Sequence, residues 1–189
     1  MVGLRLALVA VVLLAAGCGG SKVSEAGSQT PAAQLEKVIR THCSSVSGGF
    51  RACTVFHRMA GEESRIERRH GTRWSVLLPA DRAPYSRHGW WPRVLAAPKG
   101  KTLLAEWSGE CEIPFTYLIP IRTLALRQVF PLQPATPVGW TRDGLARVKL
   151  WKPIPASKTR IARPSGIYLV TPKGRVVRLE RRVPPSLGC

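Results

Sequence analysis

The segment TLLAEWSGECEIP, residues 102–114, gathers residue types that enzymes use for chemistry. Its reactive and aromatic side chains are Glu106, Trp107, Glu110, Cys111 and Glu112. Two carboxylates flanking a scissile bond are the machinery of most glycosidases, and aromatic faces such as those of Trp90, Trp91 and Trp107 can stack on sugars. One hypothesis is therefore a carbohydrate-active hydrolase of the cell envelope that uses Glu110 and Glu112.

The charge balance of the chain favours a different interpretation of the same segment. The sequence holds 29 Lys and Arg residues against 11 Asp and Glu residues. On so basic a chain, glutamates satisfy neighbouring arginines and tryptophans fill space between sheets. We therefore predict no catalytic residue, and we keep Trp107, Glu110 and Glu112 as candidate ligand-binding residues.

Other catalytic and metal-binding patterns are missing from the sequence. Asp81 and Asp143 are the only aspartates, and no Gly-x-Ser-x-Gly nucleophile elbow occurs. Cys43, Cys53 and nearby histidines do not have the spacing of a zinc site. The sequence therefore predicts a non-enzymatic protein without a metal or a cofactor.

The first twenty residues, MVGLRLALVAVVLLAAGCGG, indicate export. Arg5 precedes an apolar run over residues 6–16, which suits a signal-peptide core and is too short to cross a bilayer as a helix. The small residues before Cys18 resemble the lipobox of bacterial lipoproteins, although Ala15 stands where that motif usually has leucine. The resemblance implies that residues 1–17 are a lipoprotein signal peptide and that Cys18 is lipidated.

A lipidated Cys18 would place the protein at the outer, extracytoplasmic face of a bacterial cell membrane. Residues 18–29, including GGSKVSEAGSQ, read as a flexible tether, and residues 30–189 as the folded domain. Without residues 1–17, 28 basic and 11 acidic residues leave a net charge of +17. Such a body would attract anionic lipid headgroups or anionic wall polymers, and no nucleic-acid partner is expected outside the cytoplasm.

Four cysteines follow Cys18, and an even number in an exported protein indicates two disulfides. Cys43 and Cys53 bracket the pair Gly48 and Gly49, which favours a Cys43–Cys53 bridge across a turn. Cys111–Cys189 would then be the second bridge and would fix the last residue. Two other pairings of the four cysteines remain open.

One helix and many short strands are expected in the domain. Thr30 and Pro31 suit a helix start, and apolar residues at helical spacing extend it to about Thr41. From Phe50 the pattern alternates, with Gly and Pro turns at short intervals, as in an all-β fold. The segments FRACTVFHRM, SRIERRH and TRWSVLLP are the first candidate strands. The later ones are residues 94–97, 102–107, 115–121, 124–130, 138–141, 146–151, 166–171 and 176–181.

A repeat organises these strands. RVLAAPKGKTLLAEW and VGWTRDGLARVKLW align on Gly100 and Gly144, which are 44 residues apart, and a propeller blade repeats every 40–45 residues or so. These segments and GIYLVTPKGRVVRL resemble the blades of TolB-type β-propellers over residues 91–182, with a weaker echo in residues 50–79. Lys99 replaces the usual aspartate of the first turn, whereas Asp143 keeps it in the second.

The chain is too short for a closed propeller, which needs at least four blades. We expect two to three four-stranded, propeller-like blades as an incomplete propeller, an open sheet stack or one folded-over sandwich, unless association completes a ring. Functionally, the sequence predicts a lipid-anchored binding or scaffold module of the envelope with a protein or anionic polymer partner. A hydrolase and a polyanion binder are the alternatives.

Overall fold

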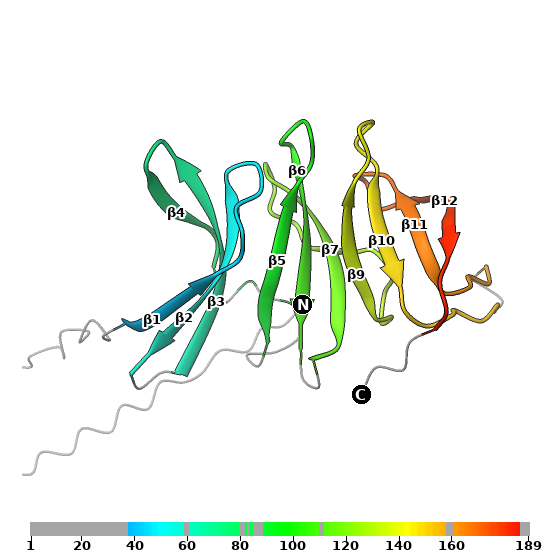
Figure 1. Cartoon of the computed structure of the whole chain (residues 1–189), viewed down its shortest axis with the longest axis horizontal. Helices are drawn as coiled ribbons and strands as arrows, with labels where there is room; N and C mark the ends of the chain where they lie inside the picture. Colours follow the sequence, from blue (N-terminus) through cyan, green and yellow to red (C-terminus); the bar gives the residue numbers. More distant parts are fainter. Residues whose placement is uncertain are drawn as a thin grey trace, which may run out of the picture. The chain divides into compact units, whose positions relative to one another are not determined.

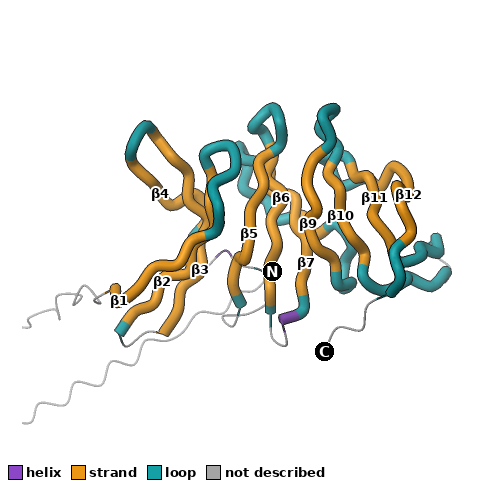
Figure 2. The backbone as a smooth tube through the Cα atoms, viewed as in Figure 1, coloured by secondary structure: helices purple, strands orange, loops and turns teal. Residues whose placement is uncertain are grey.

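The computed structural model describes residues 38–58, 61–79, 82, 84, 89–109, 112–157 and 161–185. All of them belong to one unit, Leu35–Cys189. They form three four-stranded antiparallel sheets, and the described residues contain almost no helix (Figures 1 and 2). The all-β prediction is therefore confirmed. Each sheet contains consecutive strands only, and we call the three the N-terminal, middle and C-terminal sheets.

The N-terminal sheet has the strand order β1-β2-β3-β4. Along β2, the residues Phe50 and Ala52 lie in a buried apolar cluster. The alternate residues Arg51 and Cys53 therefore belong to the opposite face of the sheet. The Cys43–Cys53 disulfide predicted from the sequence is present, and it joins residues directly opposite each other on β1 and β2. The strands are β1 Val38–Cys43, β2 Phe50–His57, β3 Gly61–His70 and β4 Arg73–Leu78.

The helix predicted up to about Thr41 is wrong for the residues that the structure describes, because β1 begins at Val38. The β-branched residues Val38, Ile39 and Thr41 favour an extended backbone. Pairing with β2 and the disulfide at Cys43 then hold them in the sheet. Residues 31–37 of the predicted helix lie outside the described residues.

The middle sheet has the order β5-β6-β7-β8 and is apolar on both faces. Its last strand is much shorter than the predicted strand over residues 124–130. Leu124 has a positive φ of 54° and its N–H donates to the Pro120 carbonyl, so a turn occupies the start of that segment. Val129 and Phe130 leave the strand and enter a core instead. The strands are β5 Trp90–Ala96, β6 Thr102–Ser108, β7 Pro114–Pro120 and β8 Arg127–Gln128.

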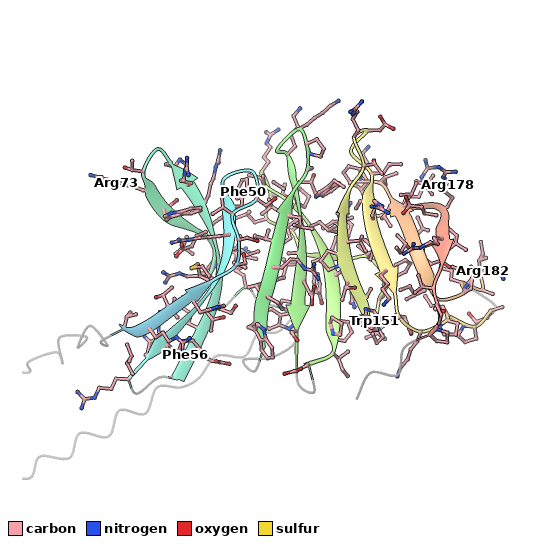
Figure 3. The ribbon with its side chains drawn as sticks, in the orientation of Figure 1. Phe50, Phe56, Arg73, Trp151, Arg178 and Arg182 are labelled. Carbon is pink, nitrogen blue, oxygen red and sulfur yellow. A yellow bond between two sulfur atoms is a disulfide. The ribbon has the colours of Figure 1, made fainter. Side chains whose placement is uncertain are left out.

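The C-terminal sheet has the order β12-β11-β10-β9. The arginine-rich segment RVVRLERR therefore forms an edge strand, and charged side chains discourage such an edge from pairing with another chain. Arg178 and Arg182 project from this strand in Figure 3. The strands are β9 Ala135–Trp140, β10 Ala146–Leu150, β11 Gly166–Val170 and β12 Val176–Arg182.

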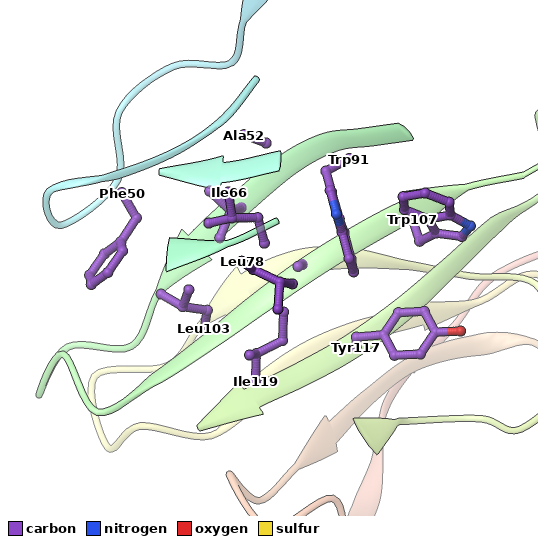
Figure 4. Packing of buried hydrophobic residues seen from close by; sticks show 11 residues of the cluster. Phe50, Ala52, Ile66, Leu78, Trp91, Leu103, Trp107, Tyr117 and Ile119 are labelled. Carbon is purple, nitrogen blue, oxygen red and sulfur yellow. The ribbon is translucent and has the colours of Figure 1, made fainter. Parts of the chain in front are cut away.

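Two hydrophobic cores lie on the two faces of the middle sheet. Between the N-terminal and middle sheets, Trp91 packs edge-to-face on Trp107 and Tyr117, with ring centroids 4.9 and 6.0 Å away (Figure 4). On the other face, Leu104 and Leu118 pack with residues of the C-terminal sheet. Each fully buried large apolar side chain contributes about 1.5–3 kcal/mol, so the middle sheet joins the other two.

The first hairpins of the three sheets turn at the same end, which we call the turn end (Figure 1). A Cβ placed on Gly48, in the β1–β2 turn, would lie 2.6 Å from the Ala96 Cβ at the end of β5. The Trp140 Nε1, at the end of β9, donates to the Leu95 carbonyl over 3.1 Å. These contacts bring the ends of consecutive sheets together, so the turns of the three sheets lie at one end of this unit.

Candidate functional site

Among the described residues, seven exposed Lys and Arg residues lie in the turns of the turn end or directly beside one, against one acid, Asp143. They come from all three sheets, and nitrogen-tipped side chains project beyond the β5–β6 and β9–β10 turns (Figure 3). In the part of the chain that the structure describes, none of the seven forms an ion pair within 4.0 Å. We call this set the basic end: Arg73, Lys99, Lys101, Arg122, Arg142, Lys173 and Arg175.

The turns that carry these cations follow from the sequence. Gly100 and Gly144 adopt positive φ values of 63° and 82°, a backbone that glycine accepts without strain. Both close the first hairpin of their sheet, as the 44-residue repeat predicts. The Arg127 guanidinium donates to the Lys173 carbonyl over 2.6 Å and so ties the middle sheet to the β11–β12 turn. The cations therefore stand on fixed turns.

Four acids of the sheets are already paired with arginines of their own sheet, so they are not available to the turn cations: Glu63, Glu67, Glu106 and Glu180. Glu106 accepts from Arg93, and Glu180 accepts from Arg147, each with a nitrogen–oxygen distance of 2.9 Å. The first pair joins the neighbouring strands β5 and β6, and the second joins β10 and β12 of the C-terminal sheet. Few carboxylates are then left to neutralise the turns.

Glu67 is the most buried acid of the described residues, with 4% of its surface exposed. Two guanidinium groups lie 2.7 Å from its carboxylate oxygens. Arg51 belongs to the neighbouring strand β2, and Arg65 belongs to β3, the strand of Glu67 itself. Its Oε2 also lies 3.5 Å from the Cys53 sulfur. Arg51 in turn stacks on Trp74, with its guanidinium carbon 4.1 Å from the ring centroid.

Cys43, Cys53 and Glu67 also lie close enough together to ligate a metal, within 4.8 Å of one another. However, the two sulfurs are bonded to each other, and cysteine binds a metal as a free thiolate. The Glu67 carboxylate is already held by two cations. The geometry therefore indicates a structural ion network and not a metal centre.

A cleft of about 410 Å³ lies beside the start of β5. Its floor is the same face of the N-terminal sheet that contributes Phe50 and Ala52 to the core, continued toward the opposite ends of the strands. There the face changes from apolar to polar. We call it the β1–β3 cleft, and it is lined by Arg40, His42, Thr54, Phe56, Glu62 and Trp90.

Strand pairing arranges the floor of this cleft in rows. Arg40 pairs with Phe56, which pairs with Glu62, so a cation, an aromatic ring and an anion stand side by side. Ser64, in the next row, accepts a hydrogen bond from the Trp91 N–H over 2.7 Å. That bond fixes β5 against the sheet at the boundary between core and cleft.

A second cavity of about 460 Å³ lies between the segment after β8 and the C-terminal sheet. Its lining is mostly apolar, with Phe130, Ile154, Ile161 and Val176, and includes the charged residues Arg163 and Arg175. Arg163 is engaged through its backbone, which exchanges hydrogen bonds with Ile154. This lining offers a cation near apolar surface but no acid.

Of the candidate ligand-binding residues predicted from the sequence, Trp107 and Glu112 lie among the described residues. Trp107 is 2% exposed and lies in the core against Trp91, so its ring serves packing. Glu112 is exposed, with a positive φ of 54°. Glu110 and three predicted cysteines, Cys18, Cys111 and Cys189, lie outside the described residues. The hydrolase hypothesis and the second disulfide stay predictions.

The sequence contained weak signals for the cleft. Trp90 is one of the tryptophans that could stack on a sugar, and His42 is one of the histidines near Cys43. No motif in the sequence connects either of them with Arg40, Phe56 and Glu62. The available signal was alternation: Thr54 and Phe56 share the face of Phe50 and Ala52, so one face of a strand becomes polar halfway along.

Comparisons of the chain with protein families, curated proteins and solved structures found no match. Among the described residues, no helix is long and apolar enough to cross a membrane.

Proposed function

We propose that this protein is a lipid-anchored, non-enzymatic binding module at the outer face of a bacterial cell membrane, and that its basic end holds an anionic polymer of the envelope. The observation that carries the proposal is a set of seven exposed, unpaired cations of the described chain. They lie in or directly beside turns of the three sheets, with Asp143 as the one acid among them. A polyanion can contact several of these turns at once, and summed charges raise both the rate and the strength of such an encounter.

A polymer suits this surface better than insertion into a membrane. Proteins that insert at a lipid interface present Trp, Phe or Leu beside their cations. Among the described turns that close the first hairpins, the large exposed apolar residue is Val46, with 52% of its surface exposed. The basic end can therefore attract anionic groups but lacks the apolar side chains for insertion into a membrane, which favours an extended, charged polymer as its ligand.

The sequence of the first eighteen residues supports the anchor. Lipidation of Cys18 would tether the domain through residues 18–29 and bring the basic end to envelope polymers. We expect Cys18→Ser to release the protein from the membrane fraction of the native bacterium, as measured by immunoblotting. Retention of the variant in that fraction would contradict the anchor without affecting the polymer proposal.

The order of the strands supports a propeller-like interpretation of the fold. Each sheet is a meander of four consecutive strands, and Gly100 and Gly144 occupy the equivalent first hairpin of two sheets. Under this proposal the sheets are three propeller-like blades in an incomplete ring, in keeping with the resemblance to TolB-type blades.

The polymer proposal is tested by direct binding of the full chain, purified in detergent, to inorganic polyphosphate as the probe. We expect binding that weakens steeply between low and physiological salt, because exposed charges are screened over about 10 Å at 0.1 M salt. The triple variant Lys99→Gln, Arg142→Gln and Lys173→Gln should weaken binding at least tenfold.

The matched control removes the same charge elsewhere: Arg58→Gln, Arg82→Gln and Lys152→Gln. All three residues are exposed and lie outside the turn end. Equal loss of binding in both triple variants would show that only net charge matters and would overturn the assignment to the basic end. Binding to phosphatidylglycerol vesicles without binding to polyphosphate would replace the polymer by a lipid surface.

A further inference from the structure

The β1–β3 cleft carries charged side chains that have no partner among the described residues. Arg40 and Glu62 are exposed at its floor, and neither forms an ion pair or side-chain hydrogen bond within the described part of the chain. Phe56 stands between them on the middle strand of the row, so the two charged groups do not meet. A ligand that contacts both must therefore offer opposite charges at a distance.

Strand geometry sets that distance. Neighbouring strands lie about 4.8 Å apart, so two steps from β1 to β3 separate the backbones of Arg40 and Glu62 by about 10 Å. An extended peptide of two to three residues spans about 7–11 Å. Its terminal carboxylate and ammonium groups match the two ends of the row in both sign and spacing.

The remaining lining suits the side chain of such a ligand. Phe56 lies on the floor, and Trp90 joins the lining from the first residue of β5. Both are only partly buried, so their rings are available for contact. The volume of about 410 Å³ lies within the usual range for small-molecule sites. A polyanion is disfavoured here, because Glu62 would repel it.

We infer that this cleft binds a short zwitterionic peptide, with its carboxylate on Arg40, its ammonium group on Glu62 and an apolar side chain against Phe56 and Trp90. The site lies away from the turns that carry the basic end, so it goes beyond the polymer-binding function and does not depend on it. Charge-assisted hydrogen bonds at both termini would make recognition depend on free peptide ends.

The test is calorimetric titration of the full chain, in detergent, with the tripeptide alanyl-phenylalanyl-alanine. We expect saturable binding in the micromolar to millimolar range. Glu62→Gln and Arg40→Gln should each raise the Kd about tenfold, the size expected for losing one charged hydrogen bond. The controls Glu180→Gln and Arg178→Gln change exposed charges on β12, outside the cleft, and should leave the Kd unchanged.

Peptides with one blocked end test which residue binds which terminus of the ligand. N-acetylation removes the ammonium group, so the acetylated peptide should bind the unaltered protein about tenfold more weakly and should be insensitive to Glu62→Gln. Amidation of the carboxylate should likewise remove the effect of Arg40→Gln. The comparison of free and blocked peptides on the unaltered protein needs no variant, so it still decides if a variant fails to fold.

Three results would overturn the inference: no binding of the tripeptide at millimolar concentration, equal binding of free and blocked peptides, or equal effects of the cleft variants and the controls. Polyphosphate binding is measured in the same samples. Glu62→Gln and Arg40→Gln should change it less than twofold, so failure of the peptide site and failure of the polymer proposal are distinguishable.

Discussion

Glu67 shows how one side chain can fix the outer face of a sheet. Its carboxylate is buried, yet it meets two guanidinium groups at 2.7 Å and lies beside the Cys43–Cys53 disulfide. Burying a charge is unfavourable unless it is paired and hydrogen-bonded. The network therefore depends on all of its members, and loss of Glu67 would leave two cations facing each other.

We expect Glu67→Gln to lower the free energy of unfolding by about 3 kcal/mol, the lower end of the range for breaking a buried pair. The lower end applies because the side chains of Arg51 and Arg65 are 26% and 25% exposed and can regain water. The control is Glu106→Gln, whose partner Arg93 is 46% exposed, with an expected loss of at most about 1 kcal/mol. Denaturant unfolding measures both, and equal losses would contradict the network.

Tyr168 gives the molecule a pH dependence at alkaline pH. It is 3% exposed, its hydroxyl donates to the Pro164 carbonyl over 2.7 Å, and burial raises its pKa above the ordinary value of 10.0. Arg163 and Arg182 oppose this shift by favouring the phenolate. Because the pKa is higher in the folded state, the stabilisation is complete below the pKa of the unfolded chain and is lost as pH rises through the folded pKa.

The variant Tyr168→Phe separates the ionisation of Tyr168 from the ionisation of other groups at alkaline pH. At neutral pH the variant should be less stable by about 1 kcal/mol, the value of one hydrogen bond. Above the ordinary tyrosine pKa the difference between the two proteins should shrink, because only the unaltered protein loses stability by ionising Tyr168. Urea unfolding at a series of pH values measures it, and a constant difference would refute the assignment.

At the scale of elements, the hairpin turns decide how closely the sheets approach. Gly48 adopts a φ of 55°, and a Cβ there would lie 2.6 Å from the Ala96 Cβ. The same end is fastened by the Ala96 N–H, which donates to the Ser47 hydroxyl over 3.0 Å. The β1–β2 turn thus needs glycine both for its backbone and for contact with β5.

Gly48→Ala should cost about 1–3 kcal/mol from overcrowding in addition to about 1 kcal/mol for a left-handed alanine. Gly71→Ala is the matched control: its φ is 60°, but nothing lies within 4 Å of the added Cβ, so only the backbone cost applies. Thermal unfolding of both variants measures the difference. A loss at Gly71 as large as that at Gly48 would mean that the contact with Ala96 is unimportant.

Local signals in the sequence were sufficient for most of the hairpins. Gly100 and Gly144 predicted their turns because a positive φ is a property of one residue. Val38 failed as part of a predicted helix because its conformation depends on β2 and on the disulfide five residues later. Residues 124–130 failed as a strand because Val129 and Phe130 are drawn into a core built by distant residues.

The two candidate sites also differ in how far local sequence signals predict them. Most cations of the basic end lie beside a turn glycine in the sequence, as Lys99, Lys101 and Lys173 do. The cleft has no such signal, because Arg40 and Glu62 are brought into one row only by the registers of β1 on β2 and of β2 on β3. No spacing along the chain encodes that row. The sequence does not reveal that Trp107 is buried in the core, because its burial depends on packing against other strands.

At the scale of the whole molecule, the middle sheet couples the two cores. Leu103 and Leu104 are adjacent on β6 and both are fully buried, but Leu103 packs toward the N-terminal sheet and Leu104 toward the C-terminal sheet. Each truncation to alanine should cost about 2–5 kcal/mol. The two variants remove the same atoms from opposite faces and are therefore matched.

We expect Leu103→Ala to raise amide hydrogen exchange mainly in β2 and β3, and Leu104→Ala to raise it mainly in β10 and β11. Exchange followed by mass spectrometry distinguishes these patterns, because local opening reports the loss of nearby buried contacts. The same exchange pattern for both variants would mean that the sheets open as one unit and that the two cores are not separable.

The position of β6 between two cores also bears on which changes in chain length the protein can tolerate. Successive residues of a strand point to opposite faces, so one inserted or deleted residue exchanges the two faces beyond it. In an edge strand such as β12, most of the side chains that change face are exposed arginines. In β6 it would send Trp107 and Leu103 into the space shaped for Leu104, and both interfaces would have to be rebuilt together. Insertions and deletions are therefore expected to accumulate in the turns and edge strands, while the length of β6 stays fixed.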